Sequence, residues 1–487
     1  MSAAHTGVEE RGQCVEIVAV GRVEEVLEPA AHLPWFHPSI LGGVTPPGCV
    51  GRIDGAEGGG DRAPFTCRPP NGHRNHHNGD VTRDDAAAGT TPRQGTPLEV
   101  FRVFLRLGVT SFGGPIAHLG YFRDDIVARR QWLNDAEYAD LVALCQFLPG
   151  PASSQVGFAI GLHRAGVRGA LAAFLAFTLP SAVLLVAFAS GAALFGGPVG
   201  EGVLAGLKIV AVAIVAQAVW GMARTLTPDR QRAAIAVIAA GAALLLAGSA
   251  GQVIAIAIGV VAGLLFCRTT PGAAPRLLRF PVARWAGIAC LVVFAALLVG
   301  LPVLARATGS HVAALFDAFY RSGALVFGGG HVVLPLLQAE VVDTGWVTTD
   351  QFLAGYGAAQ AVPGPLFTFA AYLGAVSGIG PGGVLGALIA LLAIFLPGLL
   401  LLVGVLPFWN ALRGRPSAQA VMRGANAAVV GILAAALYQP VFTTAVTGAA
   451  AFVLALVCFV LLTVWKLPSW TIVLIGAMGG ALHGAVM

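Results

Sequence analysis

The residues best suited to chemistry in this sequence lie at four chain breaks built from glycine and proline. The breaks are Gly113-Gly114-Pro115, Pro149-Gly150-Pro151, Gly328-Gly329-Gly330 and Pro363-Gly364-Pro365. A helix that begins at such a break presents its first backbone N–H groups, and the positive end of its dipole, to the space before it. Pro115 suits the first turn of a helix, which leaves the N–H groups of Ile116 and Ala117 free. The breaks therefore predict binding of an anion.

Polar side chains follow only one of the two Pro-Gly-Pro breaks. Ser153, Ser154 and Gln155 come after the first of these breaks, whereas Leu366-Phe367-Thr368-Phe369 follow the second. Because hydroxyl and amide groups can donate hydrogen bonds to an oxyanion, the first half is the better candidate for substrate contact. A kink between packed helices is the alternative explanation of any single break. Four breaks at paired positions favour a site.

Cations inside apolar runs could balance the charge of a bound anion. Arg106 precedes the first break, and Arg321 holds the matching position in the second half. Lys208 lies within the apolar run 203–220, and Asn426 is its counterpart. A lysine at membrane depth is costly and indicates function. The alternative is that these cations extend to the membrane interface and anchor their helices there.

The predicted site lies near mid-depth, between the breaks at 113–115 and 149–155, and we expect Arg106 or Lys208 to supply positive charge. His118 and His331 flank the glycine breaks and could carry protons, with packed, hydrogen-bonded histidines as the alternative. In the first half the predicted site residues are Arg106, Ser111, Gly113, Gly114, Pro149, Gly150, Pro151, Ser153, Ser154, Gln155 and Lys208. Their predicted second-half counterparts are Arg321, Gly328, Gly329, Gly330, His331, Pro363, Gly364, Pro365 and Asn426.

The composition is that of a membrane protein. Of the 487 residues, 56% are hydrophobic and 11% charged, and the mean hydropathy is +0.79, which leaves too little polar surface for a soluble protein of this size. The net charge of +5 comes from arginines between apolar runs, which orient helices rather than recruit nucleic acid. Seven cysteines show no C-x-x-C spacing, so the sequence predicts neither a metal site nor a cofactor. It contains no nucleotide-binding loop, which excludes ATP as the energy source.

The first 95 residues differ from the rest of the chain. They are rich in Gly, Pro, His, Asp and Arg and have no sustained apolar period, so we expect a disordered extension over residues 1–95. Cys67 and the nearby His73, His76 and His77 leave a metal-binding tail as the alternative.

Thirteen hydrophobic segments follow this extension. Six lie in a first repeat, 98–267, one forms a linker helix, 285–304, and six lie in a second repeat, 312–486. An odd linker between two copies reverses the second, which predicts an all-α integral membrane protein made of two inverted six-segment repeats. The first two segments of each repeat contain the breaks, and they are either broken spans or re-entrant hairpins.

The arginine-rich loops predict the orientation of the chain. They fall on one side of the membrane if the N-terminus is cytoplasmic, which places the C-terminus in the periplasm. Arg123, Arg129 and Arg130 disagree with this assignment unless the first two segments are re-entrant. The loops hold Arg164 and Arg168; Arg224, Arg230 and Arg232; Arg268, Arg276, Arg279 and Arg284; Arg413 and Arg415; and Lys466.

Several long motifs resemble the chromate ion transporter family, of the long-chain, two-domain type. The resemblance runs from about residue 98 to 486, and the first 95 residues have no counterpart in it. The motifs are Phe101-x-x-Phe104-Leu105-x-Leu107-Gly108-x-Thr110-Ser111-Phe112-Gly113-Gly114-Pro115-x-Ala117-His118, Gln146-Phe147-Leu148-Pro149-Gly150-Pro151-x-Ser153-Ser154-Gln155, Phe327-Gly328-Gly329-Gly330-His331-Val332-Val333-Leu334-Pro335-Leu336-Leu337 and Ala361-Val362-Pro363-Gly364-Pro365-Leu366-Phe367.

The resemblance implies a secondary active transporter that exports chromate across the bacterial inner membrane. It also implies that the proton-motive force drives export, with protons as the coupling ion, and that the result is chromate resistance. The residues alone lead only to an anion carrier, because chromate and sulfate are tetrahedral dianions of similar size. A permease for sulfate or another oxyanion is therefore the alternative, and a homodimer is left open. A membrane enzyme would need a redox site that the sequence does not show, and inverted repeats disfavour a passive channel.

Overall fold

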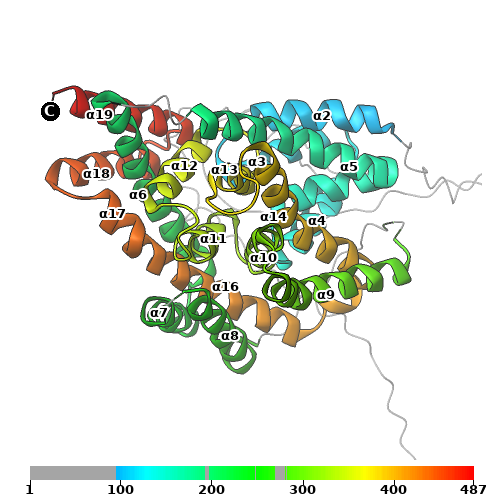
Figure 1. Ribbon diagram of the computed structural model, residues 1–487. Coiled ribbons are helices and arrows are strands. Elements are labelled where there is room, and N and C mark those ends of the chain that lie inside the picture. The colour runs from blue at the N-terminus through cyan, green and yellow to red at the C-terminus, as the bar shows by residue number, and fades with distance from the viewer. Residues whose placement is uncertain (1–94, 192–196, 247, 269–279, 281, 487) are drawn as a thin grey trace, which may run out of the picture. The chain divides into compact units, whose positions relative to one another are not determined.

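The computed structural model describes residues 95–191, 197–246, 248–268, 280 and 282–486, all within one compact unit, 85–487. Every regular element in this described part is helical (Figure 1). The extension predicted over residues 1–95 lies outside the described residues, apart from Gly95.

The helices follow the apolar runs of the sequence. Those before the linker are α2 (Pro97–Thr110), α3 (Gly114–Phe122), η3 (Arg123–Arg129), α4 (Asp135–Phe147), α5 (Ala152–Gly191), α6 (Pro198–Leu226), α7 (Arg230–Leu245) and α8 (Gly248–Phe266). The helix predicted as the linker is α9 (Arg284–Thr308). Those after it are α10 (His311–Ala324), η5 (Gly330–Val332), α11 (Val333–Val341), α12 (Thr349–Ala361), η6 (Leu366–Thr368), α13 (Phe369–Val376), α14 (Gly383–Val405), η7 (Leu406–Phe408), α15 (Trp409–Arg413), α16 (Pro416–Ala436), η8 (Leu437–Phe442), α17 (Thr443–Ala445), α18 (Ala449–Thr463) and α19 (Ser469–Val486).

The same cap opens α4 and α12, the helices that lead into the two Pro-Gly-Pro breaks. The Asn134 side chain accepts from the Glu137 N–H, and the Glu137 side chain accepts from the Asn134 N–H. Thr348 and Gln351 form the same capping box at the start of α12. A capping box satisfies two N–H groups that a helix start would otherwise leave free. The two helices therefore begin at matching places for the same local reason.

The long apolar helices give the chain the character of a multi-pass membrane protein. Five of the described helices are long and apolar enough to cross a membrane: Ala152–Gly191, Val199–Leu226, Arg284–Thr308, Gly383–Phe408 and Pro416–Ala445. Shorter apolar helices lie at Ala250–Phe266, Leu366–Val376, Ala449–Thr463 and Ser469–Leu482. The thirteen predicted segments are thus not all full-length spans, since the chain breaks shorten some of them.

The stretch α5 consists of two helices that pack against each other. Ala165 and Gly166 have non-helical backbone angles and join the two helices. A Cβ atom on Gly161 would collide with the Gly169 carbonyl, so the chain turns back at this point. The two apolar runs on either side of Ala165 and Gly166 are therefore separate helices, in agreement with the sequence.

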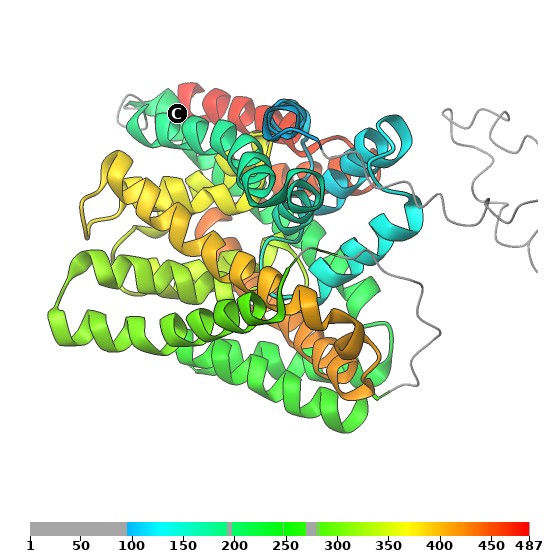
Figure 2. The same cartoon turned by 90° about the vertical axis from the view of Figure 1, so that its right-hand side faces the viewer.

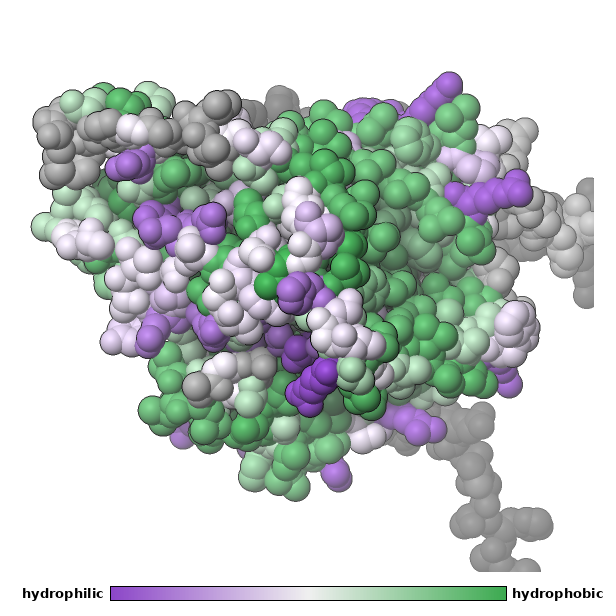
Figure 3. Space-filling model, viewed as in Figure 1, coloured by the Kyte–Doolittle hydropathy of each residue, from purple (hydrophilic) through white to green (hydrophobic). Residues whose placement is uncertain are grey.

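Apolar side chains face outward over much of this unit. On α9, Trp285 and Val299 are exposed, and on α14 the exposed side chains include Val384 and Leu392. In Figure 3 hydrophobic side chains cover the right-hand part of the face shown, and hydrophilic ones gather left of its centre. Figure 2 shows α9 lying along α10. Such exposed apolar helices suit contact with lipid, because hydrocarbon does not penalise them as water would.

The two halves of the chain exchange helices. In the first half, α7 and α8 pack against α16 of the second half, and α18 and α19 pack against α6 of the first (Figure 1). Glycines allow both crossings: a Cβ atom on Gly206 would collide with Gly476, and one on Gly424 would collide with Gly259. Small residues let membrane helices approach this closely. The exchange places α6 and α16 between helices of the opposite half.

Candidate functional site

The four chain breaks meet through two reciprocal backbone hydrogen bonds. The Gly150 N–H donates to the Val326 carbonyl over 2.7 Å, and the Gly364 N–H donates to the Ser111 carbonyl over 2.9 Å. Gly364 matches Gly150 (364 − 150 = 214), and Val326 matches Ser111 (326 − 111 = 215). Each half therefore supplies the acceptor for the break of the other. We call this meeting point the junction.

The two glycine breaks touch at the junction. Helix α2 ends at Thr110, and α3 begins at Gly114 after Gly113, whose φ is 96°. A Cβ atom on Gly330 would lie 2.9 Å from the Pro115 Cγ, and one on Gly114 would lie 3.8 Å from the His331 Nε2. Left-handed backbone and tight contact both favour glycine here. Pro115 lies in the first turn of α3, as the sequence predicts.

Each Pro-Gly-Pro break packs against a proline-containing helix of the opposite half. Gly150 has a φ of 119°, and a Cβ atom there would lie 3.0 Å from the Gly398 Cα. Gly364 has a φ of 101°, and its Cβ atom would lie 3.1 Å from the Ser181 Cβ. Ser181 and Gly398 each follow a proline inside α5 and α14. The proline-containing stretches 179–181 and 396–398 recur in the sequence and could have revealed these contacts, which the sequence prediction missed.

Polar side chains brace the junction. The Gln155 Nε2 donates to the Pro149 carbonyl over 3.0 Å and to the Gly398 carbonyl over 2.9 Å. The Ser181 hydroxyl contacts the Thr368 hydroxyl. Gln155 was predicted as a ligand, but its amide nitrogen holds two carbonyls of the chain. Only its Oε1 atom is left without a partner.

Unpaired polar atoms gather in the first half of the junction. Each is buried and has no hydrogen-bond partner in the described structure: Ser111 Oγ, His118 Nε2, Ser154 Oγ, Gln155 Oε1 and Thr178 Oγ1. A buried donor or acceptor without a partner costs about 1–3 kcal/mol, so each one needs an explanation. In the second half, the Asn426 Oδ1 and the Gln360 Nε2 are likewise unpaired, and a Cβ atom on Gly328 would lie 3.4 Å from the Asn426 Oδ1. The polar excess of the first half agrees with the asymmetry seen in the sequence.

His118 connects α3 to the start of α5. Its Nδ1 lies 3.4 Å from the Ser153 Oγ, and its ring meets Phe177 edge-on. The side chain is 1% exposed. This contact brings the first glycine break next to the serines that follow the first Pro-Gly-Pro break, as the predicted site requires. Ser153 therefore has a partner, whereas Ser154 beside it does not.

The predicted cations all have carboxylate partners. The Arg106 Nη1 lies 3.8 Å from the Asp125 Oδ1, and the Arg106 side chain is 56% exposed. Arg321 is held more tightly, with its Nη2 3.0 Å from the Asp317 Oδ2 and 2.8 Å from the Glu340 Oε2. Asp125 and Glu340 occupy matching positions (340 − 125 = 215). Carboxylates of the chain itself therefore balance the positive charge of both arginines.

Lys208 also has an acidic partner. Its Nζ lies 2.9 Å from the Asp350 Oδ1 at the start of α12, and the lysine side chain is 20% exposed. The pair joins α6 to α12, which lie in different halves of the chain. Its counterparts Asn426 and Ala136 are uncharged, so this link has no equivalent in the other half.

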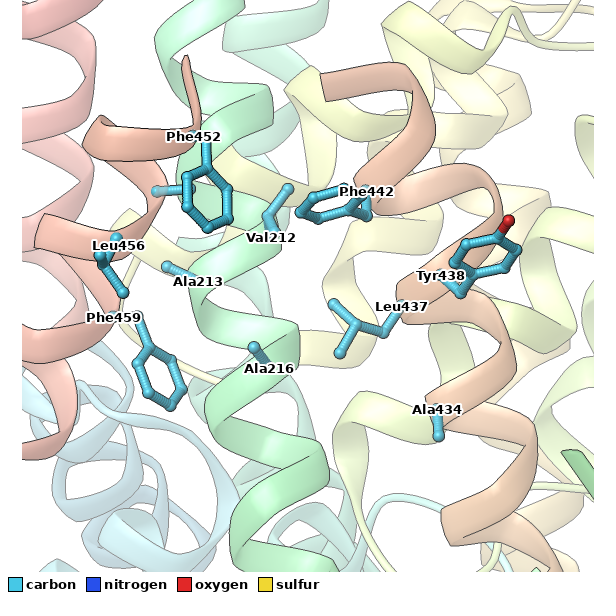
Figure 4. Close-up of a pocket in the computed structure, with 11 residues that line it drawn as sticks. Val212, Ala213, Ala216, Ala434, Leu437, Tyr438, Phe442, Phe452, Leu456 and Phe459 are labelled. Carbon is cyan, nitrogen blue, oxygen red and sulfur yellow. The ribbon is translucent and has the colours of Figure 1, made fainter. Parts of the chain in front are cut away.

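A separate apolar pocket of about 390 Å³ lies between α6, α16, η8 and α18 (Figure 4). Val212 and Ala216 line it from α6, Phe442 from η8 and Phe459 from α18. Its lining holds no charged side chain and none of the predicted site residues. It therefore does not suit a small anion.

Comparison with known proteins agrees with the motifs. The family described as "Chromate transporter" matches residues 98–264 and 313–481. A "Probable chromate transport protein" of Synechococcus elongatus is 29% identical over 79% of this chain and 95% of its own length. A "Chromate transport protein" of Cupriavidus metallidurans is 27% identical, over 83% of this chain and 96% of its own length. One of Pseudomonas aeruginosa is 27% identical, over 72% and 82%. No solved structure matches the chain. The resemblance is thereby confirmed, and the chain belongs to the chromate transporter family.

Proposed function

We propose that this chain is a secondary active transporter that exports chromate across the bacterial inner membrane and so confers chromate resistance. It is not an enzyme, and the proton-motive force supplies its energy. The family match and the names of the relatives support chromate as the substrate. The long apolar helices support a multi-pass membrane protein.

The observation that carries the proposal is the junction. Four breaks from two halves meet in two reciprocal hydrogen bonds, and five unpaired polar atoms gather in its first half. Hydroxyl groups and helix starts can both donate to a tetrahedral oxyanion. The anion binds there between the first glycine break and the start of α5, with Ser111, Ser154 and backbone N–H groups as ligands. Ser153 supports it through His118.

The proposed architecture is two inverted repeats, 98–267 and 312–486, joined by a membrane-spanning linker. The matched hydrogen bonds, the matched Arg106–Asp125 and Arg321–Glu340 pairs and the exchanged helices support it. Inverted repeats permit alternating access around a site at their interface. The N-terminus then lies in the cytoplasm and the C-terminus in the periplasm, as the arginine-rich loops suggest.

Chromate flux into inverted membrane vesicles tests the proposal. Energised vesicles with the chain should accumulate labelled chromate, vesicles without it should not, and a proton uncoupler should stop the accumulation. Labelled sulfate should accumulate poorly. Accumulation of sulfate in preference to chromate would establish the oxyanion alternative, and equilibration without concentration would establish a passive channel.

A further inference from the structure

His118 is a buried, titratable group of the junction. Binding of an anion by neutral donors alone gives this histidine no role. It is the fifth residue of α3. Its Nδ1 contacts Ser153, and its Nε2 has no hydrogen-bond partner in the described structure. A neutral imidazole has one donor and one acceptor nitrogen, whereas a protonated one donates from both. The unpaired Nε2 therefore leaves room for a change of protonation that would not break the contact with Ser153.

The charge balance of the junction shows why protonation of His118 would help to bind a dianion. The unpaired groups gathered there are hydroxyls, an amide oxygen and an imidazole nitrogen, all neutral or neutral-capable. Arg106, Arg321 and Lys208 are each paired with carboxylates. An ion that is buried without an opposite charge costs several kcal/mol even after the protein relaxes. A dianion bound by neutral donors alone would bear this cost.

We propose that His118 takes up a proton from solvent when the oxyanion binds, so that the site carries the dianion together with one proton. This inference rests on the proposed function, since it needs the oxyanion at the junction. Nδ1 then donates to Ser153, and Nε2 donates to the anion. The proton comes from water or buffer, no bond of the anion breaks, and no electron moves. The transported unit has one net negative charge.

Among the described residues, the contacts found for His118 involve no charged side chain. From α5, Ser153 and the Phe177 ring face it. The adjoining η3 carries Asp124 and Asp125, and Asp125 is paired with Arg106, Arg129 and Arg130. From α4, the Tyr138 hydroxyl donates a hydrogen bond to the Leu119 carbonyl. From the second half, His331 reaches the Gly114 side of the break, and its Nδ1 lies 2.9 Å from the Tyr356 hydroxyl.

Isothermal titration of the full chain in lipid nanodiscs measures the proton directly. Chromate is added at an alkaline pH where it is wholly dianionic, in buffers of different ionisation enthalpy, and the dependence of heat on buffer gives the protons bound per anion. We expect about one proton per chromate and an affinity that falls about tenfold per pH unit. Sulfate, which stays dianionic over the whole range, serves as a second probe.

Variants assign the proton to its residue. His118→Gln and His118→Asn should remove the proton uptake and flatten the pH dependence of affinity. His163→Gln is the matched control, because His163 lies at the far end of the first part of α5, where its ring faces Phe280. It should keep the uptake, as should His311→Gln. If neither His118 variant folds, uptake that survives in the His163, His311 and His331→Gln variants supports the assignment.

Three outcomes overturn the inference while the proposed function stands. They are chromate binding by the wild-type chain without proton uptake, uptake that persists in both His118 variants, and uptake that disappears in His331→Gln. The last would move the proton to the second half. If the wild-type chain binds neither chromate nor sulfate, the proposed function itself fails, so the two failures are distinct.

Discussion

At the scale of single residues, the junction contains two kinds of hydroxyl group. Some contact other side chains of the chain, and others have no partner in the described structure. Ser181 contacts Thr368, whereas the buried Ser154 has no partner for its hydroxyl. An unpaired buried hydroxyl lowers the stability of the free protein, so its removal can be neutral or stabilising. If the same hydroxyl binds the anion, its removal must also weaken binding. The two effects then have opposite signs.

We therefore predict that Ser154→Ala lowers chromate affinity about tenfold or more, because a hydrogen bond to a charged group contributes about 1.5–3 kcal/mol. The melting temperature should stay the same or rise. Ser181→Ala is the control and should lower the melting temperature, since it deprives Thr368 of a partner. Calorimetric titration and thermal unfolding of both variants check this. Unchanged affinity in Ser154→Ala would remove that serine from the site.

The arginines give a second residue-scale prediction. A site in the first half, as the sequence predicts, would make Arg106→Ala more harmful to transport than Arg321→Ala. For stability, the ion pairs predict the opposite order, with Arg321→Ala the more harmful. Arg321 is the cation of the buried Asp317, whereas Asp125 keeps Arg129 and Arg130 after Arg106 is lost.

Arg321→Ala should therefore destabilise the chain by about 2–3 kcal/mol, at the low end for a broken buried pair because the arginine is partly exposed. Arg106→Ala should leave stability within about 0.5 kcal/mol. Thermal unfolding measures both, and transport must be compared at equal amounts of folded protein. Equal stability of the two variants would show that the Asp317 pair contributes little.

What the sequence could predict at this scale was the identity of polar residues near the breaks, and not their partners. Gln155 bonds to Gly398 across 243 positions, and Lys208 to Asp350 across 142. Such partners depend on how distant helices pack, which residue types and local spacing do not determine. The local feature, Pro115 in the first turn of α3, was predicted because it depends only on the neighbouring chain.

At the scale of elements, the apolar runs of the sequence predicted where the helices lie, and the glycine and proline residues predicted where they are interrupted. Helices end at Thr110, Phe147, Ala324 and Ala361, each next to a predicted break. Their pairing could not be predicted. The close crossings of α6 with α19 and of α16 with α8 depend on glycines four residues apart, which are Gly202 and Gly206, Gly476 and Gly480, and Gly259 and Gly263. This spacing favours close helix packing, but it does not identify the partner helix.

We predict that Gly424→Ala destabilises the chain by about 1–3 kcal/mol, the usual effect of overpacking, because its Cβ atom would collide with Gly259 and push α16 away from α8. Gly241→Ala on α7 is the control. No heavy atom lies within 4 Å of its added Cβ, so it should be neutral or slightly stabilising. Thermal unfolding in detergent compares them. Equal melting temperatures would mean that the crossing tolerates a wider separation.

At the scale of the whole molecule, the exchange of helices makes the two halves interdependent. Helix α16 lacks its packing partners α7 and α8 if the second half is made alone, and α6 lacks α18 and α19 if the first half is. We predict that the chain divided between residues 268 and 282 yields little stable protein from either half alone. Both halves expressed together should assemble and restore chromate flux. Membrane fractions and affinity co-purification measure this, and a half that accumulates alone with full stability would contradict the prediction.

The start of the described chain sets a sharp limit for truncation. The Gly95 N–H donates to the Arg164 carbonyl over 3.0 Å, and the Thr96 Oγ1 accepts from the Glu99 N–H over 3.2 Å, which caps α2. Removal of residues 2–94 keeps both contacts, so we predict unchanged membrane insertion and chromate flux. Removal of residues 2–97 deletes the cap and should cost about 1 kcal/mol of stability.

The two truncated chains, compared by thermal unfolding and vesicle flux at equal protein level, also test the extent of the transport unit. The family match begins at residue 98, directly after the cap. If removal of residues 2–94 abolishes flux while the protein stays folded and inserted, the first 94 residues contribute to transport itself. If both truncated chains melt together with the full chain, Thr96 does not stabilise α2, and the helix is held by its packing on α5 alone.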